Sequence, residues 1–250
     1  MELQLAGRTA LVTGASMGIG RAIARGLAAE GVRLAVVARR RELLETLAAE
    51  IETGGGAHPA LIVQDIMAED AAPRIAGAAS AALGTVEILV NCAGGSRPMP
   101  IDAPEERWVE AITLNFTRQR QLTHALLGEM MTRKWGRIIN ITGKSEPDRL
   151  NAAFAAKAAI HSWAKGLSRD VGRFGITVNS IAPGRIISEQ ILRNYPPEDR
   201  KRFSETEIPV GEYGQPEDLA VLAVFLASPL AHYITGTVIP VDGGLRRYQF

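Results

Sequence analysis

A glycine-rich turn near the N-terminus is the segment whose residue types and spacing point most directly to chemistry. The run Thr13-Gly14-Ala15-Ser16-Met17-Gly18-Ile19-Gly20 lies between an apolar stretch and an amphipathic one. Gly14 permits a tight turn, Gly18 lets the backbone approach a bound group, and Gly20 lets a helix pack against a strand. The free N–H groups and dipole of a helix that begins here favour an anion. The turn therefore predicts a site for the pyrophosphate of a dinucleotide; the alternative is a glycine-rich turn without a ligand.

The end of the second apolar run indicates which dinucleotide is preferred. An acidic side chain about 20 residues after the glycine turn would accept a hydrogen bond from the ribose 2′-OH of NAD. The residue there is Ala38, which cannot accept one, and it is followed by Arg39 and Arg40. A guanidinium at Arg39 can pair with a 2′-phosphate in fork geometry. We therefore expect NADP(H) to be preferred, with NAD(H) possible; the alternative is that both arginines form a solvated helix start.

The elements that must position these residues follow from the apolar periodicity. Short runs that are almost continuously apolar are typical of strands buried on both faces, and they cover Thr9–Thr13, Arg33–Val37, Ala60–Val63, Ile88–Asn91, Arg137–Ile141, Thr177–Ile181 and Val238–Val241. Amphipathic stretches between them predict helices over Ile19–Glu30, Arg41–Thr53, Ala68–Leu83, Glu105–Arg133, Asn151–Phe174 and Pro216–Ala227. This alternation predicts an α/β fold, a Rossmann-type doubly wound parallel sheet of about seven strands with helices on both faces.

The chain is expected to form a single dinucleotide-binding domain over residues 1–250, because neither a linker nor a repeat interrupts the alternation. The least regular segment, 185–214, contains Pro196, Pro197 and Pro209 together with many charges. We expect it to form a helical excursion that acts as a substrate lid.

The overall composition excludes several classes of function. The 250 residues are 46% hydrophobic and 22% charged, with a formal net charge of +1. This balance indicates neither a nucleic-acid partner nor a membrane partner. The N-terminus lacks a secretory pattern and no apolar stretch approaches the ~20 residues of a membrane span, so we expect a cytoplasmic protein. Cys92 is the sole cysteine, and the histidines share no metal-ligand spacing with acids or with it, so we expect no metal site.

Several ordered motifs extend the evidence of the glycine turn, whose spacing is T-G-x-x-x-G-x-G. Asn91-Cys92-Ala93-Gly94 follows the fourth expected strand, and Pro183-Gly184 follows the sixth. Asn115 lies in an expected helix, and Val241-Asp242-Gly243-Gly244 lies near the C-terminus. Together these motifs resemble those of the short-chain dehydrogenase/reductase family over nearly the whole chain.

The resemblance implies an oxidoreductase that binds a nicotinamide dinucleotide. It implies that Asp65 and Ile66 lie beside the adenine and that Ile186 and Ser188 hold the nicotinamide amide. Besides the glycine turn, Arg39 and Arg40, the implied cofactor residues are Asp65, Ile66, Asn91, Ala93, Gly94, Lys157, Pro183, Gly184, Ile186 and Ser188.

The catalytic pattern of the family is incomplete in this sequence. In the family a tyrosine supplies the proton, a serine orients the substrate oxygen, and a lysine four residues after the tyrosine holds the ribose and lowers the pKa of the tyrosine. Lys157 matches the lysine, but Ala153 stands in place of the tyrosine. Gly143 occupies the usual serine position, and the segment from it to Ala153 is shorter than the family norm. Asn115 matches the family asparagine, which anchors a water chain.

Residues near Gly143 and Ala153 are candidates to replace the missing hydroxyl groups. Ser145 or Thr142 can supply a hydrogen bond in place of the serine. Lys144 is the best placed substitute for the tyrosine, because a lysine in an apolar, cation-rich site can donate a proton near neutrality. Tyr195 in the expected lid is another candidate. The alternative for Lys144 is a solvated loop residue, and for Lys157 a helix lysine that faces solvent.

Three functions are compatible with this pattern. The first is an NADP(H)-dependent oxidoreductase that acts on a carbonyl or alcohol of a small-molecule substrate with an atypical proton donor. The second is a non-catalytic dinucleotide-binding sensor or partner protein, and the third is non-redox elimination or dehydration. The resemblance also implies a homotetramer or homodimer formed through the helices Glu105–Arg133 and Asn151–Phe174.

Overall fold

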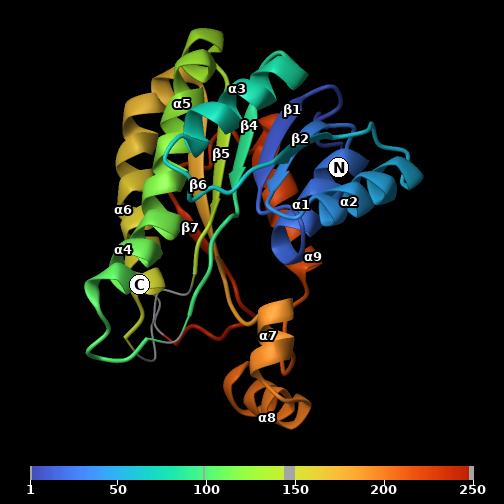
Figure 1. The fold of residues 1–250 in the computed structure, drawn as a ribbon. Coiled ribbons are helices and arrows are strands. Elements are labelled where there is room, and N and C mark those ends of the chain that lie inside the picture. The colour runs from blue at the N-terminus through green and yellow to red at the C-terminus, as the bar shows by residue number, and fades with distance from the viewer. Residues whose placement is uncertain (1, 98, 144–149, 248–250) are drawn as a thin grey trace.

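The computed structural model describes residues 2–97, 99–143 and 150–247. Seven strands form one parallel sheet in the order β3-β2-β1-β4-β5-β6-β7 (Figure 1). The strands are β1 (Thr9–Thr13), β2 (Arg33–Ala38), β3 (Ala60–Val63), β4 (Ile88–Asn91), β5 (Gly136–Ile141), β6 (Ile176–Pro183) and β7 (Val238–Val241). The order reverses between β1 and β4, so that a crevice opens beyond the carboxyl ends of these two strands.

Helices cover both faces of the sheet, which confirms the predicted doubly wound fold (Figure 1). One face packs against α1, α2 and α9, and the other against α3, α5 and α6. The helices are α1 (Gly18–Ala29), α2 (Arg41–Thr53), α3 (Ala71–Leu83), α4 (Glu105–Ile112), α5 (Arg118–Arg133), α6 (Ala152–Val171), α7 (Glu189–Asn194), α8 (Pro197–Glu207) and α9 (Pro216–Ala227). In Figure 1, α7 and α8 lie beyond the carboxyl edge of the sheet, in the segment expected to form a lid.

Four expected helices have different bounds in the structure, and the difference is smallest for α1, which is shifted by one residue at each end. The stretch Glu105–Arg133 is divided by a π-helical turn, η1 (Thr113–Thr117), because the side chain of Asn115 donates to the carbonyl of Ala111 within the helix. The helix expected from Ala68 begins at Ala71, since the chain first forms turns after Asp65. The helix over Asn151–Phe174 is α-helical only as far as Val171 and ends in a 3-10 turn. Apolar periodicity does not encode such local changes of hydrogen bonding.

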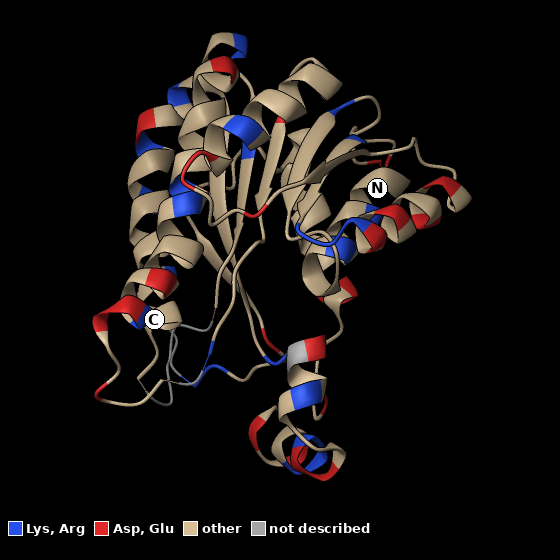
Figure 2. Ribbon diagram, in the orientation of Figure 1, with Lys and Arg blue, Asp and Glu red and all other residues tan. Residues whose placement is uncertain are grey.

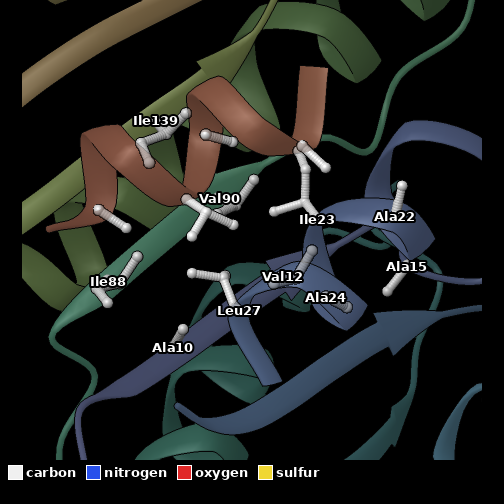
Figure 3. Packing of buried hydrophobic residues seen from close by; sticks show 14 of the residues in the cluster. Ala10, Val12, Ala15, Ala22, Ile23, Ala24, Leu27, Ile88, Val90 and Ile139 are labelled. Carbon is white, nitrogen blue, oxygen red and sulfur yellow. The ribbon is translucent and has the colours of Figure 1, made fainter. Parts of the chain in front are cut away.

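The core beneath the glycine turn is formed by α1, β1, β4 and α9. Leu27 and Ile23 of α1 lie fully buried among Val12 of β1 and Val90 of β4 (Figure 3). A Cβ atom on Gly26 of α1 would lie 3.0 Å from a methyl carbon of Val224 on α9, so the two helices are in close contact. This packing holds α1 in place against the sheet, and with it the glycine turn that precedes the helix.

Truncation of Leu27 is the first test of this core. We expect Leu27→Ala to lower the free energy of unfolding by about 2–5 kcal/mol, because it removes buried methyl groups and leaves a cavity. The control is Val221→Ala on α9, whose side chain is 73% exposed and should change the stability by less than about 0.5 kcal/mol. Urea denaturation of both variants measures the difference, and equal midpoints would contradict the assigned core.

Charged residues lie mainly on the helices and loops, whereas the strands carry few (Figure 2). The exceptions in the strands are Arg33 of β2 and Arg137 of β5. Arg137 is buried, donates to the carbonyls of Ser228 and Gly175, and stacks on the ring of Trp135. Among the described residues, no helix is both long enough and apolar enough to cross a membrane.

Candidate functional site

The glycine turn connects β1 to α1 in a conformation that depends on its glycines. Gly14 has a φ of 68°, and a Cβ atom there would lie 2.9 Å from the backbone of Ala93. A Cβ atom on Gly20 would overlap the carbonyl oxygen of Gly14, so any side chain at 20 would displace the turn. Gly18, with a φ of 53°, has open space where its Cβ would be. The backbone is therefore close-packed behind the turn and open in front of it, as a bound phosphate requires.

The first turn of α1 is available to an anion. Its N-cap residue, Met17, makes no side-chain capping hydrogen bond, and the first turn contains no acidic residue. The N–H groups at the start of a helix need acceptors and carry a partial positive charge. The residues present thus fit the pyrophosphate of a dinucleotide.

Thr13 ties this turn to the end of β4. Its hydroxyl donates to the carbonyl of Val90 at 3.3 Å and accepts from the N–H groups of Cys92 and Ala93 at 3.0 and 3.1 Å. Thr13 is itself fully buried, so its role in the structure is to hold the two loops at the switch point together.

A cleft of about 770 Å³ lies along the carboxyl ends of the strands. It extends from the glycine turn, past the end of β2, to η1 and the start of α6. Many residues expected at the cofactor line it, namely Gly14, Ser16, Met17, Gly18, Ile19, Gly20, Arg39, Arg40, Asp65, Ile66, Ala93, Gly94 and Ser188, and Asn115 lines it as well. A cleft at the switch point of a doubly wound sheet is where ligands bind in such folds.

Other expected residues lie behind this surface and support it. Asn91 is buried and donates to Thr123 and to Asn140, which links β4 to α5 and β5. Pro183 ends β6, and Gly184 is packed so closely that a Cβ atom would lie 2.6 Å from Asp242. These contacts place the residues in the framework of the cleft.

The segment after Gly184 begins the excursion that contains α7 and α8. Ile186 is buried and pairs with Gly214, and Ser188 caps α7 by accepting from the N–H of Ile191. The guanidinium of Arg185 lies 4.7 Å from the ring of Phe203 on α8. These contacts join the two ends of the excursion to each other and tie its start to α8.

Sequence reasoning missed a group of polar residues at the outer half of the cleft. They come from the loop after β4, from α4 and from the start of α6, and include Arg97, Arg107, Glu110 and Asn151. Arg97 pairs with Glu110 at 3.3 Å, and Asn151 donates to the Ser96 hydroxyl at 2.9 Å. No motif marks these positions, because they meet only through the tertiary fold.

The basic residues after β2 form loose contacts across the end of the cleft that lies beside β2. Arg39 lies 4.0 Å from Asp65, and Arg40 lies 3.9 Å from Glu189 and 3.4 Å from the Met17 sulfur. Arg39 is 76% exposed, so its ion pair contributes little to stability. Its guanidinium is therefore free to exchange the carboxylate for a ligand phosphate at small cost.

Asn115 lies in the π-helical turn and fixes the loop after β4. Its amide donates to the carbonyl of Gly95 at 3.0 Å, and its side-chain oxygen accepts from the N–H of Gly95 at 3.1 Å. A Cβ atom on Gly94 would lie 2.9 Å from that oxygen. The glycines thus let the loop lie directly on the asparagine.

Lys157 projects from α6 toward the ends of β4 and β5. Its Nζ donates to the carbonyl of Thr142 at 2.8 Å and to that of Ile141 at 3.4 Å. Burial, opposed by the nearby Cys92, lowers the pKa of Lys157 to about 8, while burial raises the pKa of the Cys92 thiol to about 12 against the effect of Lys157. These bonds direct Nζ to backbone carbonyls at the end of β5, and the role of Lys157 at the ribose stays a prediction.

Thr142 and His161 form a second polar contact beside Lys157. The Thr142 hydroxyl donates to the carbonyl of Ile181 at 3.1 Å and lies 2.8 Å from Nε2 of His161. Burial, followed by the charges of Lys157 and Arg246, lowers the pKa of His161. The Thr142 hydroxyl is thus engaged within the framework, which argues against its use as the replacement for the family serine.

The family's tyrosine position is occupied by a buried methyl group. Ala153 is 2% exposed, and its N–H donates to the side chain of Asn151, which caps α6. The proposed substitutes Lys144 and Ser145 lie outside the residues that the structure describes. No group of three or more potential metal-ligating side chains occurs in the described part of the chain.

The fold, the anion-binding turn and the adjoining cleft define a dinucleotide-binding α/β protein. A family model described as enoyl-(acyl carrier protein) reductase matches residues 14–246. The chain is 35% identical over 251 residues to galactitol 2-dehydrogenase (L-tagatose-forming) of Cereibacter sphaeroides, with 96% of each chain covered. The chain belongs to the short-chain dehydrogenase/reductase family, as its motifs predicted, and is an oxidoreductase of this type.

Two solved structures are similar over almost their whole length. One is a 7α-hydroxysteroid dehydrogenase complexed with NADH and 7-oxo glycochenodeoxycholic acid, at a TM-score of 0.92 and 33% identity, covering 97% of this chain and 96% of that one. The other is L-sorbose reductase from Gluconobacter frateurii complexed with NADPH and L-sorbose, at a TM-score of 0.93 and 27% identity, covering 99% and 100%. The two relatives thus hold different nicotinamide cofactors.

Proposed function

We propose that this protein is an NADP(H)-dependent oxidoreductase that interconverts a carbonyl and an alcohol on a small-molecule substrate, with a proton donor other than tyrosine. The observation that carries the proposal is the single cleft that joins the glycine turn to Asn115 and the start of α6. A dinucleotide bound along it would supply a hydride at its nicotinamide end. Ser16, Gly18 and Ile19 would hold the pyrophosphate, and Ile186 and Ser188 the amide end.

The preference for NADP(H) rests on the residues after β2. Ala38 cannot accept a hydrogen bond from a ribose hydroxyl, whereas Arg39 and Arg40 line the same end of the cleft. Arg39 pairs with the carboxylate of Asp65 at 4.0 Å, where a phosphate would compete well for the guanidinium. L-sorbose reductase, which was solved with NADPH and its sugar substrate, is a precedent for this cofactor in the same fold.

We also propose a domain organisation, a substrate lid and an oligomeric state for this protein. The chain would act as one domain, the segment 185–214 would close over the substrate, and the assembly would be a homotetramer or homodimer through α4, α5 and α6. The polar lining contributed by Arg97, Glu110 and Asn151 favours a substrate with hydrogen-bonding groups over a purely apolar one.

The test is turnover of NADPH and NADH with a panel of ketones, aldehydes and oxoacyl thioesters, combined with binding titrations of both cofactors. We expect NADPH to bind at least tenfold more tightly and to be consumed with at least one class of carbonyl. Comparable affinities would contradict the preference. Tight binding without turnover of any member would favour the non-catalytic sensor or partner role, which the missing hydroxyls at Gly143 and Ala153 otherwise suggest.

A further inference from the structure

The two positions that lack the family's hydroxyl groups are both related to Lys157, Gly143 by direct packing and Ala153 by its position one turn earlier in α6. A Cβ atom on Gly143 would lie 3.1 Å from Lys157 Cδ, closer than ordinary van der Waals contact. The stem of the lysine therefore occupies the space into which a serine at 143 would extend. Ala153 lies one helical turn before Lys157 on the same face of α6, where residues four apart are neighbours. Gly143 thus leaves room for the lysine stem, and Ala153 adds no hydroxyl group one turn away on the same helix face.

The amine of Lys157 lies directly behind the wall of the cleft. A Cβ atom on Gly94, a residue that lines the cleft, would lie 3.6 Å from Nζ. An ammonium group has three N–H donors, of which the carbonyls of Thr142 and Ile141 accept two. Among the described residues, one donor is left for a further acceptor. The four-carbon stem is flexible, so this donor can be directed toward a ligand in the cleft.

We propose that the Lys157 ammonium itself protonates the substrate oxygen, so that one amine replaces both the tyrosine and the serine; this rests on the carbonyl reduction proposed above. A bound reduced nicotinamide would supply the carbonyl carbon with a hydride and its electron pair, and would itself be oxidised. The C=O π electrons move to oxygen, and the oxygen takes one proton from Nζ. The neutral amine then regains a proton from water, and the reverse sequence oxidises the alcohol.

The surroundings keep this proton exchangeable near neutral pH. Burial lowers the pKa of Lys157 to about 8, which suits a general acid because the acid is protonated at pH 7 and still releases its proton readily. In the described structure, the titratable groups that lie beside Lys157 or act on its charge are Cys92, after β4, and His161, on α6. The pKa of Cys92 is raised to about 12, and that of His161 is lowered by burial and by the charges of Lys157 and Arg246. Lys157 is therefore the one of these three neighbours expected to titrate between pH 7 and 9.

A titration of the unliganded chain tests the first half of the proposal without reference to activity. Heteronuclear NMR of protein labelled at the lysine Cε carbons follows each lysine with pH, and the signal missing from Lys157→Arg identifies Lys157. We expect a midpoint near pH 8, against about 10.4 for a lysine in water. Gly143→Ser should move the midpoint upward, because the added atoms displace the stem toward solvent. A wild-type midpoint near 10.4 would overturn the proposal.

Kinetics of the variants test the second half. Wild-type reduction of a carbonyl identified by the panel should fall tenfold per pH unit above about pH 8, and alcohol oxidation should rise through the same pH. Lys157→Arg keeps a positive charge and hydrogen-bond donors but does not release its proton, so kcat should fall about 10²- to 10⁴-fold while NADPH binding is largely kept. The matched control is Lys165→Met, which changes an exposed lysine of the same helix and should behave as wild type.

The outcomes separate this proposal from the oxidoreductase assignment. If Lys157→Arg retains kcat and its pH profile, Lys157 is not the proton donor, whereas the proposed function stands. A Gly143→Ser variant that gains activity with an unchanged pH profile would also overturn the role of Lys157 as proton donor. That result would show that a serine side chain at 143 does not displace the stem of Lys157. A wild-type chain that turns over no carbonyl would overturn the proposed function, and this proton transfer with it.

Discussion

Replacing Ala38 with aspartate and Arg39 with alanine together is expected to reverse the cofactor preference from NADPH to NADH. Removing the guanidinium abolishes a charge-assisted pairing with the 2′-phosphate, and each such bond contributes about 1.5–3 kcal/mol. NADPH should therefore bind about 10- to 150-fold more weakly to Arg39→Ala, with the affinity for NADH nearly unchanged. The aspartate adds an acceptor for the ribose hydroxyl of NADH and repels the phosphate of NADPH.

The matched control for this experiment is Arg41→Ala. Arg41 begins α2 and lies 4.0 Å from Glu45, and it does not line the cleft. Arg41→Ala and Arg39→Ala lower the net charge by the same amount. A comparison of the two variants therefore separates a specific contact with the 2′-phosphate from a general attraction of the protein for an anionic ligand. The comparison is made by isothermal titration at two salt concentrations. A change in NADPH affinity of equal size in both variants would refute a specific phosphate contact at Arg39.

Gly20→Ala is expected to abolish measurable dinucleotide binding while the rest of the fold is retained. The new methyl group would overlap the carbonyl oxygen of Gly14, and backbone atoms cannot move aside as a flexible side chain can. Either the turn opens or the start of α1 shifts, and the N–H groups that would hold the pyrophosphate lose their alignment. We expect NADPH affinity to fall at least 100-fold and the melting temperature to fall by several degrees.

Gly128→Ala is the control for this glycine. Gly128 lies within α5, and apart from its own stretch of helix backbone no atom of the described structure lies within 4 Å of its added Cβ. Alanine there should leave binding unchanged and stabilise the helix by up to about 1 kcal/mol. Circular dichroism and fluorescence titration of both variants give the two readouts. Intact NADPH binding by Gly20→Ala would mean that the turn does not hold the pyrophosphate.

The framework of the fold was predictable because its signals are local. Near-continuous apolar runs such as Ile88–Asn91 place the strands, and the spacing of Gly14, Gly18 and Gly20 places the turn. The break of the long helix at Asn115 was not predictable, because it depends on how that side chain bonds within the fold. Local patterns report which segments are helical or extended, but not an altered hydrogen-bond register inside them.

The candidate site was predictable only where a motif marks it. The part of the cleft lined by Gly14 and Arg39 follows from the glycine turn and the end of β2, whereas Asp65 was expected from the family resemblance. The outer half, with Arg97 and Asn151, has no motif and depends on loop paths. The same limit applies to the proton donor. The sequence directed attention to Lys144 in the altered loop, whereas the packing of Lys157 against Gly143 is visible only in three dimensions.

Transfer of deuterium from the cofactor to a product is the most direct test of the proposed activity. The chain would be mixed with NADPH dideuterated at C4 of the nicotinamide and with each carbonyl of the panel, and the products would be analysed by mass spectrometry. We predict an alcohol that carries one deuterium on its carbinol carbon, with a lower yield from the corresponding NADH. Tight binding of NADPH with no deuterium in any product would contradict an NADP(H)-dependent carbonyl reductase.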